Sequence, residues 1–136
     1  MKVTVDWVGQ HDKSLNFVGK NEKRQRVMFG GEGDYVSPME TLLMSVGSCA
    51  SIDVVMILEK ARQKITGCQC KLESKRADEP PRRFTEIELH FVVSGKDLSV
   101  KQVKKAVDLS VEKYCSVMHS LAKDTNIKTS FEIVPV

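Results

Sequence analysis

Residues 38–61 form a long apolar segment that limits the folds open to this chain. Its apolar positions recur at helical spacing and cover more than one face: Leu42, Leu43, Val46, Cys49, Ala50, Val54, Ile57, Leu58 and Ala61. Pro38 suits the first position of a helix, and Ser37 suits the capping position before it. A helix that is apolar on several sides has to be buried. We therefore expect a central helix that the rest of the fold covers.

The segments before and after this helix alternate apolar and polar residues, as β-strands do. Three short alternating stretches in the first thirty residues predict an antiparallel meander. Gly67 predicts a break after the helix. The later predicted elements are a hairpin of residues 68–76 and 84–93 with a turn at 78–81, a helix that Ser99 caps and that continues or restarts near Tyr114, and a closing strand at 126–134.

The order of these elements decides the fold class. Strands, a helix, a hairpin, helices and a last strand do not show the regular alternation of a doubly wound parallel sheet. The pattern predicts an α+β fold with an antiparallel sheet packed on a long buried central helix, in one domain of residues 1–136. A chain of 136 residues offers little cover for so apolar a helix. We therefore expect an intertwined or tightly packed homodimer.

Charge and composition exclude several classes of function. The formal net charge is +3, and the lysines and arginines are spread among acidic residues, which argues against nucleic-acid binding. The first residues lack the basic flank and apolar run of a secretory signal, and no uninterrupted apolar stretch is expected to span a bilayer. We therefore expect a cytoplasmic protein that does not enter the membrane.

Two cysteines lie on predicted helices. Cys49 stands between small residues in the sequence GSCAS, which leaves room for a substrate to approach its sulfur. Cys115 has Lys113 as a near neighbour, and a nearby cation is expected to lower a thiol pKa. Each cysteine taken alone is more often a packing residue than a reactive one, because cysteine is among the most buried residue types.

The remaining candidate ligands are His119, Cys68 and Cys70. His119 follows Cys115 by one helical turn, so the two could form a Cys/His dyad or half a metal site. Cys68 and Cys70 are two apart on a predicted strand, so both point to one face. A zinc site needs about four ligands, and neither pair finds a second close pair to complete it.

The two helical cysteines and their surroundings together resemble a known family. A glycine-rich loop leads into SPMETLLMSVGSCASIDV at residues 37–54, and KYCSV follows at residues 113–117. This combination resembles the OsmC-like family, which includes the organic hydroperoxide resistance proteins, and the resemblance runs from end to end. It implies an intertwined α+β homodimer.

The resemblance also implies thiol peroxidase chemistry in oxidative-stress defence. Cys49 would attack an organic hydroperoxide as the thiolate and become a sulfenic acid, and Cys115 would condense with it to a disulfide. A small dithiol of the lipoyl type, or another thiol reductant, would reopen that disulfide. No metal or bound organic cofactor is needed.

The sequence departs from the peroxidase members near the expected activating group. Those members carry an arginine in the amino-terminal hairpin, held by a glutamate directly after the proline. Here Met39 follows the proline and Glu40 comes one place later, while the nearest arginines are Arg24 and Arg26. Glu40 is the carboxylate assigned to the site with the two cysteines, although a regular helix puts it on the face opposite Cys49.

Two further interpretations remain open from the sequence. A non-catalytic or differently reactive OsmC-like protein could bind a hydrophobic small molecule at the dimer interface, with the cysteines lining the site. A metalloprotein could use Cys115 with His119, or Cys68 with Cys70. Ligand binding that survives alkylation of Cys49 would favour the first, and metal analysis of the purified protein would test the second.

Overall fold

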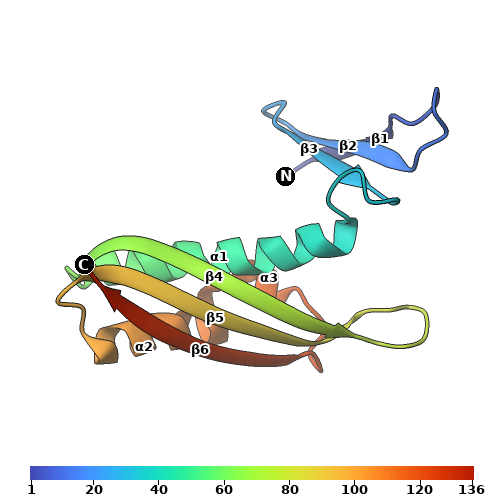
Figure 1. The fold of residues 1–136 in the computed structure, drawn as a ribbon. Helices are drawn as coiled ribbons and strands as arrows, with labels where there is room; N and C mark the ends of the chain where they lie inside the picture. The colour runs from blue at the N-terminus through green and yellow to red at the C-terminus, as the bar shows by residue number, and fades with distance from the viewer. The chain divides into compact units, whose positions relative to one another are not determined.

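The computed structural model describes all 136 residues, which form two compact parts, residues 1–43 and residues 44–136. Helix α1 (Pro38–Lys60) runs from the first part into the second (Figure 1). The chain is α+β, as the order of elements predicted, with one three-stranded sheet in each part.

The first part is the predicted meander of β1 (Val3–Trp7), β2 (Asn16–Asn21) and β3 (Arg26–Gly30), paired antiparallel in that order. The pairing register places most of the apolar side chains on one face of the sheet, Val3, Val5, Trp7, Phe17, Val27 and Phe29, and places Val18 and Met28 on the other. Val5 and Val27 on the more apolar face are 59% and 50% exposed. The first part therefore presents an apolar sheet face that it does not itself cover.

Both ends of α1 follow local backbone rules. The Glu40 amide donates to Ser37 Oγ and the Ser37 amide donates to Glu40 Oε1, each at 3.1 Å, so that the pair forms a capping box. At the other end Arg62 adopts a left-handed φ of 57°, which ends the helix. The helix ends before Gly67, as predicted, but Gly67 itself lies inside the next strand at a register shift.

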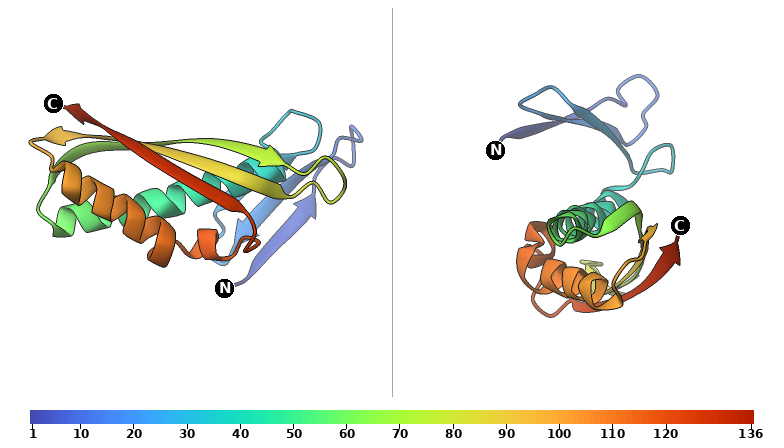
Figure 2. Two further views of the ribbon diagram at one scale, coloured as in Figure 1. Left: turned by 90° about the horizontal axis from the view of Figure 1, so that it is seen from below. Right: turned by 90° about the vertical axis from the view of Figure 1, so that its left-hand side faces the viewer.

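The second part contains the other sheet and the remaining helices (Figure 2). Its elements are β4 (Lys64–Arg76), β5 (Phe84–Lys96), α2 (Val100–Leu109), the π-helical turn η1 (Ser110–Tyr114), α3 (Ser116–His119) and β6 (Asn126–Pro135). The β4–β5 hairpin is antiparallel, but β6 pairs with β5 in parallel. The expectation of a purely antiparallel sheet therefore fails for β6, because the α2–α3 crossover returns the chain to the start of β5.

The core of the second part lies between the sheet and the helices, which cover one face of it (Figure 2). The fully or almost fully buried side chains are Val46, Ala50, Val54 and Leu58 of α1, Ile87, Leu89, Phe91 and Val93 of β5, and Val103, Ala106 and Val107 of α2. The opposite side of α1 is open within one chain, with Ile52 60% and Met56 50% exposed. The central helix is thus buried along one stripe in the isolated chain.

Helix α1 is also long and apolar enough to cross a membrane by length and composition alone. The apolar run of this helix is not uninterrupted, because Asp53 lies within it. A core helix of a globular protein meets the same criteria, and the stripe from Val46 to Leu58 packs inside the second part of the chain.

Candidate functional site

The structure brings Cys49 and Cys115 together, although 66 positions separate them in the sequence. Cys49 lies in the middle of α1 and is partly exposed, whereas Cys115 lies between η1 and α3 and is fully buried. Both are free thiols, and Cys49 lies near enough to Cys115 to raise the pKa of its thiol. The Cys49 thiol is therefore accessible to a reactant from solvent, whereas the Cys115 thiol is not.

A π-helical turn positions Cys115. The Cys115 amide donates to the Ser110 carbonyl at 2.8 Å, which closes a wider loop than an α-helical turn would. Cys115 is then the capping residue of α3, and its sulfur accepts a hydrogen bond from the Met118 amide at 3.4 Å. Single π-turns are frequent at functional sites, and here the turn ends at Cys115, whose extended backbone separates it from α3.

Ser110 ties this turn to α1 and is a site residue that the sequence reasoning missed. It is fully buried, and its hydroxyl donates to the Ala50 carbonyl at 2.9 Å, next to Cys49 in sequence. Its oxygen also lies 3.4 Å from a carboxylate oxygen of Asp53. The missed signal is a polar residue that continues the buried stripe of Val103 and Val107 at helical spacing.

The surroundings of Cys115 disfavour its thiolate. Burial raises the pKa of Cys115 to about 11, and the neighbouring Cys49 and Asp53 act in the same direction, while the hydrogen bond from the Met118 amide opposes them. The expected lowering by Lys113 is wrong, because the Lys113 ammonium lies over the Tyr114 ring, 5.3 Å from its centroid. Cys115 is therefore a protonated thiol at neutral pH.

His119 does not form the dyad with the Cys115 thiol that its spacing allowed. Its ring nitrogens lie against backbone carbonyls instead, with Nδ1 2.8 Å from the Cys115 oxygen and Nε2 3.0 Å from the Glu112 oxygen. A neutral imidazole has one N–H, so it donates to one of these two carbonyls, while its other nitrogen lies against the second. This position makes His119 a clamp on the segment that carries Cys115.

Glu40 belongs to the first part of the chain and has a structural partner there. The hydrogen bond from the Ser37 amide lowers the pKa of the Glu40 carboxyl and engages it in capping α1. Its assignment to the chemistry of the site stays a prediction. Arg26 lies on β3 and Arg24 in the turn before it, and both side chains are exposed.

Cys68 and Cys70 form a second thiol group. They point to the same face of β4, as predicted, and that face is the one covered by the helices. Burial raises the pKa of both thiols, and the nearby Ser51 side chain of α1 acts in the opposite direction. At 100° per residue, Ser51 and Cys49 lie about 160° apart around α1. The two thiol groups therefore occupy opposite flanks of the helix.

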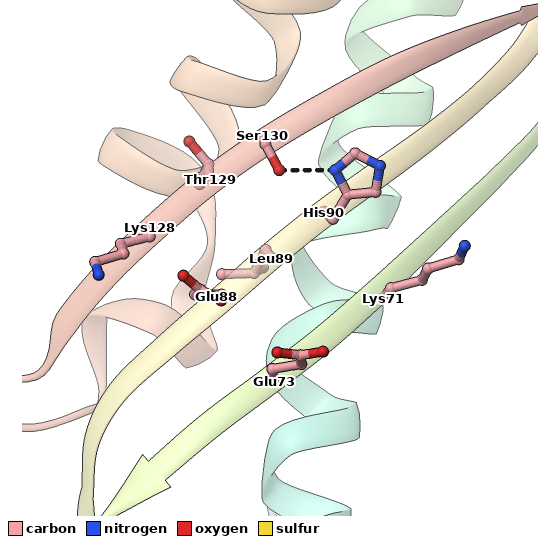
Figure 3. Close-up of a pocket in the computed structure, with 8 residues that line it drawn as sticks. All are labelled: Lys71, Glu73, Glu88, Leu89, His90, Lys128, Thr129 and Ser130. Atoms are coloured by element: carbon pink, nitrogen blue, oxygen red, sulfur yellow. Dashed lines mark hydrogen bonds between the residues drawn. The ribbon is translucent and has the colours of Figure 1, made fainter.

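The opposite face of the same sheet carries a polar hollow of about 510 Å³ (Figure 3). It is lined by Lys71, Glu73, Glu88, Leu89, His90, Lys128, Thr129 and Ser130. His90 Nδ1 lies 2.7 Å from Ser130 Oγ, as Figure 3 shows. Side chains alternate along a strand, so the polar residues of β4 that line this hollow point away from Cys70. The hollow does not belong to either thiol group.

Comparison with known proteins decides the family. The family profile described as OsmC-like protein matches residues 31–130, which include both helical cysteines. The chain belongs to the OsmC-like family. Protein YhfA of Escherichia coli strain K12 is 48% identical over 136 residues, with 98% of each chain covered.

Solved structures of OsmC-like and similar proteins share the fold. A hypothetical protein from Aquifex aeolicus VF5 is 33% identical and superimposes with a TM-score of 0.87, over 99% of this chain and 96% of that one. An organic hydroperoxide resistance protein from Elizabethkingia anophelis is 12% identical with a TM-score of 0.72, over 98% and 97% of the two chains. This OsmC-like chain therefore has the fold of the organic hydroperoxide resistance proteins.

Proposed function

We propose that this chain is a thiol peroxidase that reduces organic hydroperoxides in oxidative-stress defence. The observation that carries the proposal is the partly exposed thiol of Cys49 close to the buried thiol of Cys115, whose pKa it raises. A reactive thiol must meet its oxidant, and a resolving thiol works best where it reaches only its partner. The two environments match these two roles.

The proposed reaction has two oxidative steps. The Cys49 thiolate attacks the O–O bond, which releases the alcohol and leaves Cys49 as a sulfenic acid. Cys115 then attacks that sulfur, so that a disulfide forms, a proton is lost from Cys115, and one water molecule leaves. The peroxide is reduced by two electrons and the two thiols are oxidised by two.

A small dithiol of the lipoyl type is the proposed reductant. Its first thiolate would attack the disulfide at the exposed sulfur of Cys49, and its second would release the mixed disulfide, so that both cysteines return to thiols. No metal or organic cofactor takes part in these steps. A reducing compartment such as the cytosol suits this cycle.

Mass mapping of the thiols tests the proposal directly. The wild type and Cys115→Ser receive one equivalent of cumene hydroperoxide and are then alkylated. We expect the wild type to lose two thiols as a Cys49–Cys115 disulfide, and the variant to carry a trappable sulfenic acid at Cys49. Unchanged Cys49 in both proteins would overturn the peroxidase assignment.

The clamp formed by His119 predicts a selective kinetic defect. In His119→Ala the ring contacts to the Glu112 and Cys115 carbonyls are lost, and only the backbone amide of residue 119 still donates to the Cys115 carbonyl, so the segment carrying Cys115 is less well held. We expect disulfide closure to slow by about three- to tenfold, since a net hydrogen bond contributes roughly 1 kcal/mol.

Rapid-quench mass spectrometry separates this defect from a general loss of activity. His119→Ala should accumulate sulfenic acid at Cys49, while the rate at which Cys49 consumes peroxide stays unchanged. His119→Gln keeps one donor and serves as the intermediate control. Equal slowing of both steps would show that His119 has a merely structural role.

We also propose that the protein works as a homodimer in which α1 lies at the interface. The open side of α1 and the apolar face of the β1–β3 sheet are both exposed in one chain. Apolar faces of this kind on a small protein are typical of association surfaces. Ile52, 60% exposed in the middle of α1, is the most direct probe of this interface.

Light scattering during size-exclusion chromatography tests the dimer. We expect the wild type to elute with the mass of two chains and Ile52→Glu to elute with that of one, because a carboxylate in an apolar interface lacks a partner. Val100→Glu changes an apolar residue that is 65% exposed on α2 and is the matched control. A wild type with the mass of one chain would contradict the proposal.

A second candidate function is the binding of a hydrophobic small molecule without catalysis. A hollow of about 400 Å³ on the β1–β3 sheet favours it, because Val3, Val5, Val27 and Phe29 are among its lining residues. Titration with a fluorescent fatty acid before and after alkylation of Cys49 distinguishes the two functions. Two results together would favour the binding protein: tight binding that alkylation leaves unchanged, and thiols that do not react with peroxide.

A further inference from the structure

A histidine at the polar hollow on the β4–β6 sheet lies between a hydroxyl and a carboxylate. His90 Nδ1 is 2.7 Å from Ser130 Oγ, and His90 Nε2 is 3.6 Å from Glu132 Oε1. The proposed peroxidase cycle uses none of these three residues. A hydroxyl, an imidazole and a carboxylate in this order are the groups of a serine nucleophile, its general base and the partner that orients the base.

Strand pairing produces this order of side chains. His90 on β5 is directly opposite Ser130 on β6, and Glu132 follows Ser130 by two residues, so that the three side chains point to one face of the sheet. The array therefore stands on two paired strands rather than on a loop, which favours a fixed geometry. Ser130 is exposed, so a substrate reaches its hydroxyl from solvent.

The two partners of His90 favour one arrangement of its proton. A neutral imidazole carries one N–H, and the nitrogen without it is an acceptor. The Glu132 carboxylate can only accept, so it favours the tautomer with the proton on Nε2. Nδ1 is then the acceptor for the Ser130 hydroxyl, which is the arrangement that a general base requires.

Two unpaired carboxylates lie at the same hollow. Glu73 on β4 and Glu88 on β5 are cross-strand partners, both line the hollow, and neither forms a salt bridge. Lys128, which also lines it, is paired with Glu86 at 2.8 Å. Like charges directly opposite each other destabilise a sheet. A cationic group bound between Glu73 and Glu88 would therefore be favoured.

We propose that Ser130, His90 and Glu132 form a second active site, which hydrolyses small esters that carry a cationic group. Ser130 Oγ attacks the ester carbonyl carbon, and its proton moves to His90 Nδ1. The imidazolium returns this proton to the leaving oxygen, so that the alcohol departs and the acyl group stays on Ser130. Water then attacks the acyl group with His90 as base, which releases the carboxylic acid and restores the serine.

Lys71 is the cation available for the charge that develops on the carbonyl oxygen. It is the cross-strand neighbour of His90 on β4, lines the hollow and forms no salt bridge. Its flexible stem lets the ammonium reorient within nanoseconds. One mobile cation in an open hollow stabilises this charge less than fixed donors in a closed site, so we expect a modest rate enhancement.

Hydrolysis of two esters of equal shape tests the site, after iodoacetamide has blocked the accessible thiols. The pair is meta-(trimethylammonio)phenyl acetate and its uncharged analogue meta-tert-butylphenyl acetate. We expect Ser130→Ala and His90→Ala to lower kcat/KM for the cationic ester by about 100-fold, the lower end for general base catalysis. Ser94→Ala removes a hydroxyl four residues along β5 from His90 on the same face and should keep full activity.

Two further variants separate orientation of the base from substrate binding. Glu132→Gln should lower kcat by roughly tenfold and leave KM unchanged, because it affects only His90, and Glu132→Asp should restore part of kcat. Glu73→Gln/Glu88→Gln should raise KM for the cationic ester alone, because the uncharged ester gains nothing from the two carboxylates.

Labelling of the wild type with a fluorophosphonate gives a readout that does not depend on the variants folding. We expect mass mapping to find the phosphonyl group on Ser130. Absence of this label, or equal hydrolysis by the wild type and Ser130→Ala, would overturn the second active site. Equal kcat/KM for the two esters in the wild type would overturn the cationic substrate class. None of these results would bear on the reaction of Cys49 with peroxide.

Discussion

Cys49→Ser is expected to lose hydroperoxide reduction down to the uncatalysed rate, a fall of at least about 1,000-fold. A serine hydroxyl at this position of α1 cannot reduce the O–O bond by the sulfenic acid route. The measurement is consumption of cumene hydroperoxide with dihydrolipoamide as the electron donor. Cys68→Ser is the matched control, because it changes a partly exposed thiol on the other flank of α1 and should keep full activity.

Cys115→Ser should block the second step of the cycle, the formation of the disulfide, and leave the first step intact. The first turnover at Cys49 is expected to proceed at the wild-type rate, because the attacking thiol is intact, and the sulfenic acid should then persist. If Cys49→Ser retained turnover, the assignment of the nucleophile would be wrong, whatever the behaviour of Cys115→Ser.

The rate of disulfide closure is expected to rise by roughly tenfold per pH unit between about pH 7 and pH 10. The thiolate is the attacking species, and burial raises the pKa of Cys115 to about 11. Below that pKa each unit of pH raises the thiolate fraction tenfold, so closure should be slow at neutral pH and level off above about pH 11. Three pH units thus correspond to a change of about 1,000-fold.

Rapid-quench mass spectrometry at a series of pH values, started from Cys49 already oxidised to the sulfenic acid, measures this rate. The matched control is Cys115→Ser, in which decay of the sulfenic acid into an external thiol reports the dependence that remains without the buried thiol. A closure rate that stays flat from pH 7 to pH 10 would show that Cys115 reacts in a more exposed arrangement than the one in the structure.

The fold was predictable wherever a pattern of neighbouring residues carries the information. Apolar spacing predicted α1, and Ser37 and Ser99 marked the starts of α1 and α2, because capping depends on residues within one turn. The parallel pairing of β6 with β5 was not predictable in this way. A strand shows which of its faces is apolar, and the direction of its partner depends on the length and path of the crossover between them.

The candidate site was predictable to a smaller extent. The resemblance to the OsmC-like family selected Cys49 and Cys115, whose side chains the structure brings near each other. Proximity in sequence gave the wrong direction for the pKa of the Cys115 thiol, because Lys113 is two residues from Cys115 but lies over the Tyr114 ring. His119 at one turn from Cys115 likewise bonds to carbonyls rather than to the thiol.

The sequence by itself determined the order of helices and strands, the apolar faces that must be covered, and the family, because periodicity and short motifs are local properties of the chain. Only the tertiary structure decided that Cys115 is buried with a raised pKa, that Ser110 joins η1 to α1, and that Cys70 is buried with a raised pKa. Desolvation and hydrogen bonding depend on which distant residues pack together, and residue order alone does not contain those distances.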